Sequence, residues 1–361
     1  MAKKLRIPIS LLLCIGLLAG CNKSSNVQTK ETSFENKTEK VTITDSSGAK
    51  VEIPSQVNNI ADAWGAHNAI VAMLGAGDKI TATTLTNKTK PWLFKVTPGM
   101  SKASLSFNVD ATDINVEELV KIKPDVLFIS SGNKNVSKIT ELGIPVVQVG
   151  FKDFDSMKSC VTLTGDILGE NGKERAEKYI SYLDDKLKMI TNETSKISQD
   201  KKPKVVHIAD YSPLKVDGKD TIIDSWIQAA GGTNAADFSG TKEVSIEQIM
   251  SWNPDILIVS STVGSSDRKK NLDEITSGET WKKINAVKNG KVYINPDGAF
   301  SWDRYSSEEA LQIQWAAKII QPDIFKDIDV SKETKWFYKK FFNYELSDDE
   351  VQQILNGQPP Q

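Results

Sequence analysis

Short apolar runs alternate with amphipathic stretches along most of the chain. Alternating apolar and polar residues around a Ser-Ser-Gly turn predict a β-hairpin over residues 41–54. Beyond it, strand-like runs such as residues 126–130 and 144–150 are separated by stretches with helical spacing, and the same rhythm returns from residue 204 onward. Strands that alternate with helices predict parallel sheets covered by helices on both faces.

One long amphipathic stretch interrupts this rhythm. Residues 171–198 contain no proline and no glycine after Gly172, and their apolar residues recur at helical spacing. A helix of about 25 residues spans nearly 40 Å at a rise of ~1.5 Å per residue. The sequence therefore predicts an α/β fold in which two Rossmann-like lobes with parallel sheets are joined by a single long helix. The expected limits are residues 41–170 for the N-terminal lobe, 171–198 for the linking helix and 199–361 for the C-terminal lobe.

Two segments, one in each predicted lobe, repeat a common plan. Residues 115–129 (NVEELVKIKPDVLFI) and 244–258 (VSIEQIMSWNPDILI) each read as a glutamate, a two-turn helix, Pro-Asp and a strand. Their equivalent positions in the two halves make a chance match less plausible than a repeated structural unit.

The N-terminus has the layout of an export signal. Three positive residues precede an apolar run at residues 7–19, which is shorter than the ~20 residues that a membrane span needs, and small residues lead to Cys21. The LAGC sequence resembles the bacterial lipobox, which implies removal of a signal peptide (residues 1–20) and lipidation of Cys21. The alternative is an ordinary secretory signal with a chance cysteine. The polar residues 21–40 predict a flexible tether that holds the folded part at the outer face of the cell membrane.

Composition and charge are those of an ordinary globular protein. The chain is 39% hydrophobic and 25% charged, and loss of the signal changes its net charge from −2 to −5, which argues against nucleic-acid binding. After processing and lipidation only Cys160 remains, so an internal disulfide is excluded and a small buried side chain is expected.

Candidate ligand-binding residues follow the predicted strands, because ligands of open α/β sheets bind at the carboxyl ends of strands. They are Trp64, His67, Asn68, Thr84, Trp92, Ser131, Tyr211, Ser261, Phe300, Trp302, Arg304 and Tyr305. Aromatic walls suit a bulky metal chelate, and Arg304 has a planar fork that grips anionic groups. The alternatives are that the tryptophans belong to the core and that Arg304 forms an ion pair at the surface or between the lobes.

Histidine and cysteine patterns argue against a site for a bare metal ion. The sequence has no HxxxH, no CxxC and no carboxylate cluster of metal-site spacing. Of the two histidines, His67 lies in the first strand–helix loop and is the candidate axial ligand if the bound chelate is haem. His207 lies between apolar strand residues, where a buried structural histidine is expected.

Several motifs together resemble the solute-binding proteins that serve ABC importers of ferric siderophores, haem and cobalamin. They are the lipobox, DSSGAKVEIP, MLGAGDKI, the two Glu…Pro-Asp segments, AAGGTNAA, and the stretch from VYINPDGAF to ALQIQWAAKIIQPDIF. The resemblance implies two lobes bridged by a rigid helix, a ligand between them, and little opening. It also implies that Glu117 and Glu247, with Glu118 as a neighbour that can substitute, dock onto the ABC permease dimer, whose separate ATPase subunits drive transport.

Motifs of catalysis are missing. No GxGxxG opens a helix after a strand, and no Walker loop, GxSxG elbow or HExxH is present. We therefore expect a monomeric binding lipoprotein without a cofactor and without enzymatic activity, rather than an enzyme or a structural lipoprotein. Its expected ligand is a ferric siderophore, and haem, a corrinoid and a molybdate-type oxyanion are the alternatives.

Overall fold

The predicted hairpin is present at the start of the part of the chain that the computed structural model describes, residues 39–261 and 268–361. Strands β1 (Lys40–Thr44) and β2 (Lys50–Pro54) pair antiparallel, and Gly48 in the turn has a φ of 86°. Asp45 fixes the hairpin to the body of the protein, because its carboxylate accepts a hydrogen bond from the backbone N–H of Gln148 at 3.0 Å.

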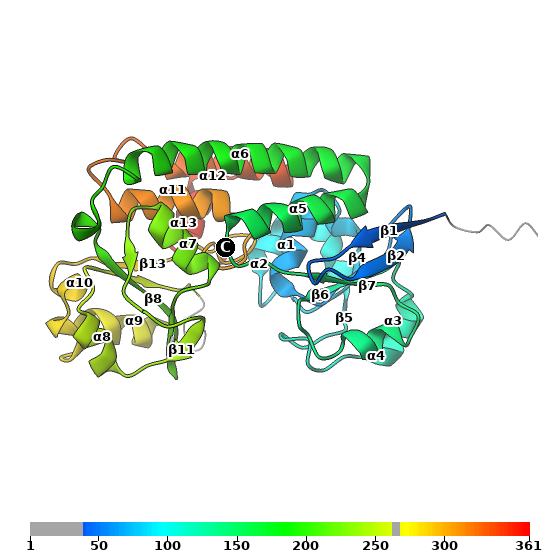
Figure 1. The fold of residues 1–361 in the computed structure, drawn as a ribbon, viewed down its shortest axis with the longest axis horizontal. Helices are drawn as coiled ribbons and strands as arrows, with labels where there is room; N and C mark the ends of the chain where they lie inside the picture. The colour runs from blue at the N-terminus through cyan, green and yellow to red at the C-terminus, as the bar shows by residue number, and fades with distance from the viewer. Residues whose placement is uncertain (1–38, 262–267) are drawn as a thin grey trace, which may run out of the picture. The chain divides into compact units, whose positions relative to one another are not determined.

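The N-terminal lobe contains a five-stranded sheet in which every pairing is parallel, as predicted (Figure 1). In spatial order its strands are β5 (Ser104–Leu105), β4 (Ile80–Thr83), β3 (Ile60–Asp62), β6 (Val126–Ser130) and β7 (Val146–Val149). Its helices are α1 (Gly65–Met73), α2 (Pro91–Val96), α3 (Val116–Ile122) and α4 (Val136–Thr140).

The long linking helix is confirmed. Helix α6 (Glu170–Thr194) follows α5 (Phe154–Leu168) through Gly169, whose φ of 85° reverses the chain. The two helices cross so closely that a Cβ added to Gly165 would lie 2.7 Å from the Cβ of Ala176. Glycine at this position therefore lets the backbones approach. Helix α5 itself is not among the predicted elements.

The C-terminal lobe has a mixed sheet. Its strands are β8 (Lys204–Tyr211), β9 (Leu214–Asp217), β10 (Thr233–Asn234), β11 (Thr241–Glu243), β12 (Ile256–Val259) and β13 (Val292–Ile294). The order is β11-β9-β8-β12-β13, with β10 also pairing with β8. The core pairings are parallel, but β9 and β11 run antiparallel, so a purely parallel sheet is wrong for this edge. A tight turn after β8 returns the chain directly, which permits only antiparallel pairing.

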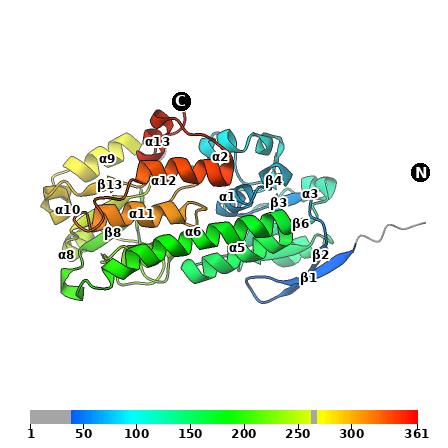
Figure 2. The same ribbon diagram turned by 90° about the horizontal axis from the view of Figure 1, so that it is seen from above.

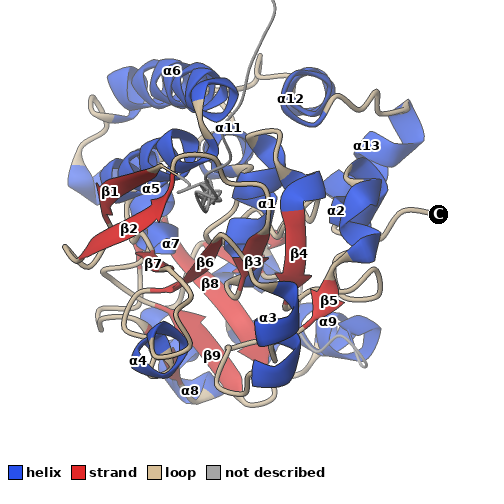
Figure 3. Cartoon of the chain, turned by 90° about the vertical axis from the view of Figure 1, so that its right-hand side faces the viewer, coloured by secondary structure: helices blue, strands red, loops and turns tan. Residues whose placement is uncertain are grey.

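Helices cover this sheet and return the chain to the N-terminal lobe. They are α7 (Ile222–Ala229), α8 (Ile246–Trp252), α9 (Arg268–Ser277), α10 (Asn285–Lys288), α11 (Glu309–Ile320), α12 (Val330–Phe337) and α13 (Asp348–Leu355). Helices α6, α11 and α12 lie side by side above the sheets (Figures 2 and 3).

The C-terminal tail contacts the N-terminal lobe. The indole N–H of Trp92 donates to the carbonyl of Gln358 at 2.8 Å, and Lys95 pairs with Glu350 at 2.9 Å. The described residues, 39–261 and 268–361, belong to one compact unit, and the exact limits of the lobes stay predictions.

The repeated sequence segments have the same structure. Helices α3 and α8 each end at a residue with left-handed backbone, Lys123 (φ 50°) and Asn253 (φ 45°). The aspartate of each Pro-Asp step then accepts a hydrogen bond from the backbone at the beginning of the neighbouring strand, either just before its first residue or at that residue. Asp125 accepts from Asn59 at 2.9 Å, and Asp255 accepts from Lys204 at 2.9 Å. The two lobes therefore share one βα building plan.

No helix in the described ranges is long and apolar enough to span a membrane. The signal peptide, Cys21 and nearly all of the tether lie outside the described residues. Lipidation therefore stays a prediction.

Cys160 is buried in the N-terminal lobe at 1% exposure, and burial raises the pKa of its thiol to about 12. Because the thiolate is the reactive form, we expect no reaction with an aromatic disulfide reagent in the folded protein and full reaction in denaturant. A thiol assay checks this, and rapid labelling of the native protein would contradict the buried placement.

Candidate ligand-binding cleft between the lobes

Two adjoining cavities lie where the lobes meet. The first, of about 520 Å³, is lined by Trp64, Thr84 and Lys90 from the N-terminal lobe and by Phe300, Arg304 and Tyr305 from the C-terminal lobe. The second, of about 500 Å³, is lined mainly by the ends of β6 and β7, including Ser131, Phe151 and Lys152. Trp64, Ser130 and Tyr305 line both cavities, which therefore form one cleft with two compartments.

Three aromatic rings bridge the lobes between these compartments. Their centroids are 5.6 Å apart for Trp64 and Tyr305, 5.7 Å for Trp64 and Phe151, and 5.5 Å for Phe151 and Tyr305. Tyr305 has a φ of 55°, an uncommon backbone conformation for a bulky residue and one that recurs at binding sites. The cluster offers flat aromatic faces toward either compartment.

The C-terminal side of the cleft is a single loop, residues 295–307, which we call the cleft loop. The buried Glu308 holds its carboxylate against five donors at distances between 2.5 and 3.3 Å. These are the backbone N–H groups of Ala299 and Phe300, the indole of Trp302, and the hydroxyls of Ser306 and Tyr338. A Cβ on Gly298 would meet the same carboxylate at 2.1 Å, so glycine is required there.

Arg304 is held by two aspartates. Its Nη2 lies 3.1 Å from Asp217 Oδ2, and its Nε lies 3.6 Å from Asp303 Oδ2. Both carboxylates also contact the buried His207, at 2.7 Å from Nδ1 and 3.0 Å from Nε2. Burial opposes the charges of this group, but the mutual attraction outweighs burial. It lowers the pKa of Asp217 and Asp303 and raises the pKa of His207 and Arg304.

Lys90 joins the N-terminal lobe to the cleft loop. Its ammonium donates to Ser301 Oγ at 2.7 Å, pairs with Asp297 at 3.1 Å, and lies 4.4 Å from the ring centre of Phe300. The lysine side chain is only 9% exposed. This contact ties the two lobes together beside the first compartment, which Lys90 helps to line.

Six of the predicted ligand-binding residues line the cleft. Trp64, Thr84, Phe300, Arg304 and Tyr305 face the first compartment, and Ser131 faces the second. Arg304 also forms ion pairs, but with two buried aspartates of its own lobe rather than at the surface or between the lobes.

His67 and Asn68, two of the predicted ligand-binding residues, are buried in the core of the N-terminal lobe and line neither compartment. Both His67 ring nitrogens are occupied, with Nδ1 2.8 Å from Asp62 and Nε2 2.9 Å from Thr164. Asn68 is bonded to the hydroxyl of Thr83 at 2.7 Å. The His67 ring lies parallel to Trp64, with centroids 6.2 Å apart, and thus supports the cleft from behind.

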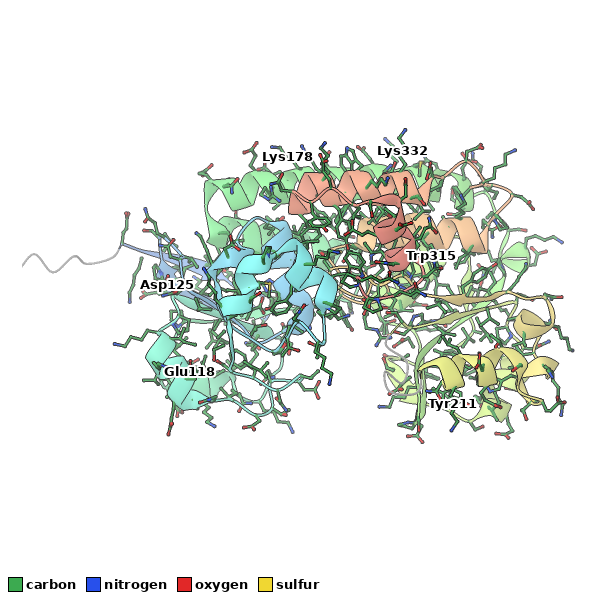
Figure 4. All side chains as sticks on the ribbon, turned by 180° about the vertical axis from the view of Figure 1, so that it is seen from behind. Glu118, Asp125, Lys178, Tyr211, Trp315 and Lys332 are labelled. Carbon is green, nitrogen blue, oxygen red and sulfur yellow. The ribbon has the colours of Figure 1, made fainter. Side chains whose placement is uncertain are left out.

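Trp92 and Trp302, which were predicted for the cleft wall, lie in the core and line neither compartment, as the alternative for the tryptophans held. Trp92 is 1% exposed beneath the C-terminal tail, and Trp302 is fully buried against Glu308. Tyr211 packs on Trp281 with centroids 6.5 Å apart, low in the C-terminal lobe (Figure 4). Ser261 is buried, and neither it nor Tyr211 lines the two compartments.

Sequence reasoning missed Lys90 and Lys152 as cleft residues. Lys90 follows Lys88 in a polar stretch, and Lys152 lies between Phe151 and Asp153. Nothing in either local pattern distinguishes these lysines from solvent-exposed residues. No group of three or more potential metal ligands occurs among the described residues.

Glu117 and Glu247 are exposed in the first turns of α3 and α8. Asn115 and Ser245 cap these helices by accepting hydrogen bonds from the backbone N–H groups of Glu118 and Gln248. Figure 1 shows α3 and α8 on the side of the lobes away from α6, and in Figure 4 Glu118 of α3 lies on the opposite side from Lys178 of α6. Glu117 and Glu247 therefore lie at equivalent positions of two matching helices, on the side of the lobes away from α6.

Comparison with known proteins gives a consistent picture. The family profile described as "Periplasmic binding protein" matches residues 65–299. A solved periplasmic solute-binding protein from Veillonella parvula is 31% identical, and the match covers 88% of this chain and 97% of that one with a TM-score of 0.75.

Two curated relatives also match over most of their length. The molybdate-binding protein MolA of Haemophilus influenzae is 24% identical over 85% of this chain and 92% of its own. The iron(3+)-hydroxamate-binding protein YxeB of Bacillus subtilis is 21% identical over 87% of this chain and 96% of its own.

Proposed function

The chain belongs to the periplasmic binding protein family, and from that premise we propose that it captures a ferric siderophore in the interlobe cleft and delivers it to an ABC importer. Members of this family are solute-binding components of transporters and not enzymes. The observation that carries the proposal is the aromatic cleft itself. Two compartments of about 500 Å³ each share walls from both lobes, a size that suits a bulky chelate.

Export and docking complete the proposal. Cys21 carries the lipid anchor at the outer face of the membrane, and the monomeric folded part meets a permease dimer through Glu117 and Glu247. The wide separation of α3 and α8 on one side of the lobes gives this contact a defined orientation.

The geometry argues against haem. Both nitrogens of His67 are bonded to protein atoms, and among the described residues neither a histidine nor a methionine lines the two compartments. A histidine ligand would therefore require rearrangement of the buried core of the N-terminal lobe. Tyr305 lines both compartments, but burial raises its pKa and so disfavours the phenolate that binds haem iron. A corrinoid needs no such ligand and remains an alternative.

A molybdate-type oxyanion is a second candidate, because the relative MolA carries that ligand in its name and matches most of the chain. A compact tetrahedral anion needs a small pocket rich in unpaired donors. Here the cleft is broad and aromatic, and Arg304 and Lys90 are already paired with carboxylates. These features favour the chelate.

The first test is a titration of the purified protein with ferric siderophores, haem, cobalamin and molybdate, followed by tryptophan fluorescence and absorption. We expect quenching at submicromolar ferric siderophore and no shift of the haem absorption band. Saturable binding of molybdate alone would replace the chelate with an oxyanion, and failure of every ligand would refute the proposal.

Replacement of Trp64 should remove most of the binding energy. We expect Trp64→Ala to weaken chelate affinity by ~30-fold or more, because a central aromatic anchor contributes ~2 kcal/mol or more. The matched control is Trp336→Ala, since Trp336 is 44% exposed on α12, far from the cleft loop in sequence. Equal affinity of both variants in a fluorescence titration would place the ligand elsewhere.

A further inference from the structure

The charges that line the cleft are balanced by their neighbours. Lys90 is paired with Asp297, whose side chain is 25% exposed, and Arg304 is paired with the buried Asp217 and Asp303. The remaining charged side chains of the lining are Lys152 in the second compartment and Asp110 in the first, and both are exposed. Among the described residues that line the cleft, Lys90 and Arg304 are therefore each held by carboxylates, and the two remaining exposed charges, Lys152 and Asp110, are of opposite sign.

The buried cluster behind Arg304 is electroneutral for a geometric reason. Each nitrogen of the His207 ring lies within hydrogen-bond distance of a carboxylate oxygen, and an ionised carboxylate only accepts hydrogen bonds. Both nitrogens must then carry protons, which makes the ring a cation. Two cations, Arg304 and His207, thus face two anions, Asp217 and Asp303.

The other buried carboxyl groups near the cleft loop add little negative charge to this electroneutral cluster. Burial raises the pKa of Glu309 well above its ordinary value and that of Glu308 to about 7, despite the donors around Glu308. Burial also raises the pKa of Asp62, which faces His67 behind Trp64. Each of these shifts reduces the negative charge close to the ligand.

We propose that the cleft selects a metal chelate with a net charge close to zero, and that Asp217, Asp303 and His207 set this selectivity by neutralising Arg304. The inference rests on the proposed function and narrows its ligand class. Arg304 then serves as a planar hydrogen-bond donor for carbonyl or hydroxamate oxygens rather than as a net positive charge. The aromatic walls supply the contact area.

Ferric chelates differ in net charge according to their iron-binding groups. Three singly charged hydroxamates cancel the charge of ferric iron, whereas three doubly charged catecholates leave a trianion. A trianion that enters an electroneutral cleft loses hydration without gaining an equivalent attraction, so it is disfavoured. A neutral complex loses much less hydration free energy when it enters the cleft.

The test compares two probes of similar bulk, ferrichrome as the neutral trihydroxamate and ferric enterobactin as the trianionic tricatecholate. In fluorescence titrations we expect ferrichrome to bind at least ~10-fold more tightly. Its affinity should change little between low and high sodium chloride, because no net charge is attracted. Tighter binding of the trianion with a steep salt dependence would overturn the inference but leave chelate capture intact, and failure of both probes would overturn both.

Charge variants separate electrostatics from shape. Asp297→Asn leaves Lys90 unpaired at a partly exposed site, and Asp217→Asn leaves Arg304 with one carboxylate fewer. We expect each variant to gain ~10-fold or more in affinity for the trianion, with an appearance of salt dependence, and to change less than ~3-fold for ferrichrome. The control Asp185→Asn alters an exposed carboxylate on α6, outside the lining of both compartments, and should change both affinities only slightly.

Both Asp297→Asn and Asp217→Asn are used so that misfolding of one variant does not leave the test undecided. If Asp217→Asn is unfolded by circular dichroism, Asp297→Asn still decides the question, because it lies outside the buried cluster. Unchanged affinity of folded Asp297→Asn for the trianion would show that paired charges do not set the selectivity.

Discussion

Protein that carries Glu117→Ala together with Glu247→Ala is expected to bind its ligand normally and to lose at least ~30-fold of ligand uptake into cells. Both carboxylates are exposed in matching first turns, so neither supports the fold or the cleft. A charge pair that becomes desolvated on docking is worth ~2 kcal/mol or more, and each 1.4 kcal/mol is a factor of ten. Loss of two such pairs therefore removes most productive encounters.

The control is Glu177→Ala with Asp185→Ala, two exposed carboxylates on α6 that change the net charge equally. Uptake of labelled chelate and affinity of the purified protein are measured for both double variants. Full uptake by the Glu117 and Glu247 variant would show that docking uses another surface. A joint loss in both double variants would indicate a general charge effect instead.

Replacement of Glu308 by alanine is expected to lower the free energy of unfolding by ~4 kcal/mol or more. The change leaves five donors without their acceptor, four in the cleft loop and the hydroxyl of Tyr338. Each buried unpaired donor costs ~1–3 kcal/mol. The variant should also lose ligand affinity, because the same loop carries Phe300, Arg304 and Tyr305. Urea unfolding and ligand titration measure the two effects, and a loss below ~1 kcal/mol would mean that the loop does not depend on this carboxylate.

Glu308→Gln probes the charge of the same group. Burial raises the pKa of Glu308 from its ordinary value of 4.5 to about 7, so the folded protein holds this proton more tightly than the unfolded chain. The contribution of this group to the free energy of unfolding is complete below pH 4.5. It is lost as the pH rises toward 7, by up to ~3 kcal/mol. Stability of the wild type minus that of Glu308→Gln should fall over this interval. A difference that is constant between pH 4.5 and 7 would contradict the raised pKa.

Local patterns predicted much of the fold for identifiable reasons. Parallel strands buried on both faces read as continuous apolar runs, as in β6 and β7, and the Pro-Asp repeats ended α3 and α8 in the same way in both lobes. The antiparallel edge formed by β9 and β11 escaped prediction. Its pairing depends on the sharp return after Tyr211, and its strands are short and largely polar.

The site residues were predicted less well than the fold, because residue type does not reveal which way a side chain faces. Trp64, Trp92 and Trp302 all follow predicted strands, yet only Trp64 lines the cleft. Trp92 is covered by a tail that is more than 250 residues away in the sequence, as its bond to Gln358 shows. The neutralisation of Arg304 likewise requires Asp217, 87 residues earlier, and such long-range pairing leaves no local signal.

The measurement that tests the central claim most directly is a crystal structure of the protein with the ferric chelate that binds most tightly in the titration, recorded at the iron absorption edge. The account predicts one anomalous iron peak inside the cleft, within contact distance of the walls formed by Trp64, Phe300 and Tyr305, with the chelate oxygens near Arg304. An iron peak on the outer surface of either lobe, or an empty cleft at saturating chelate, would contradict it.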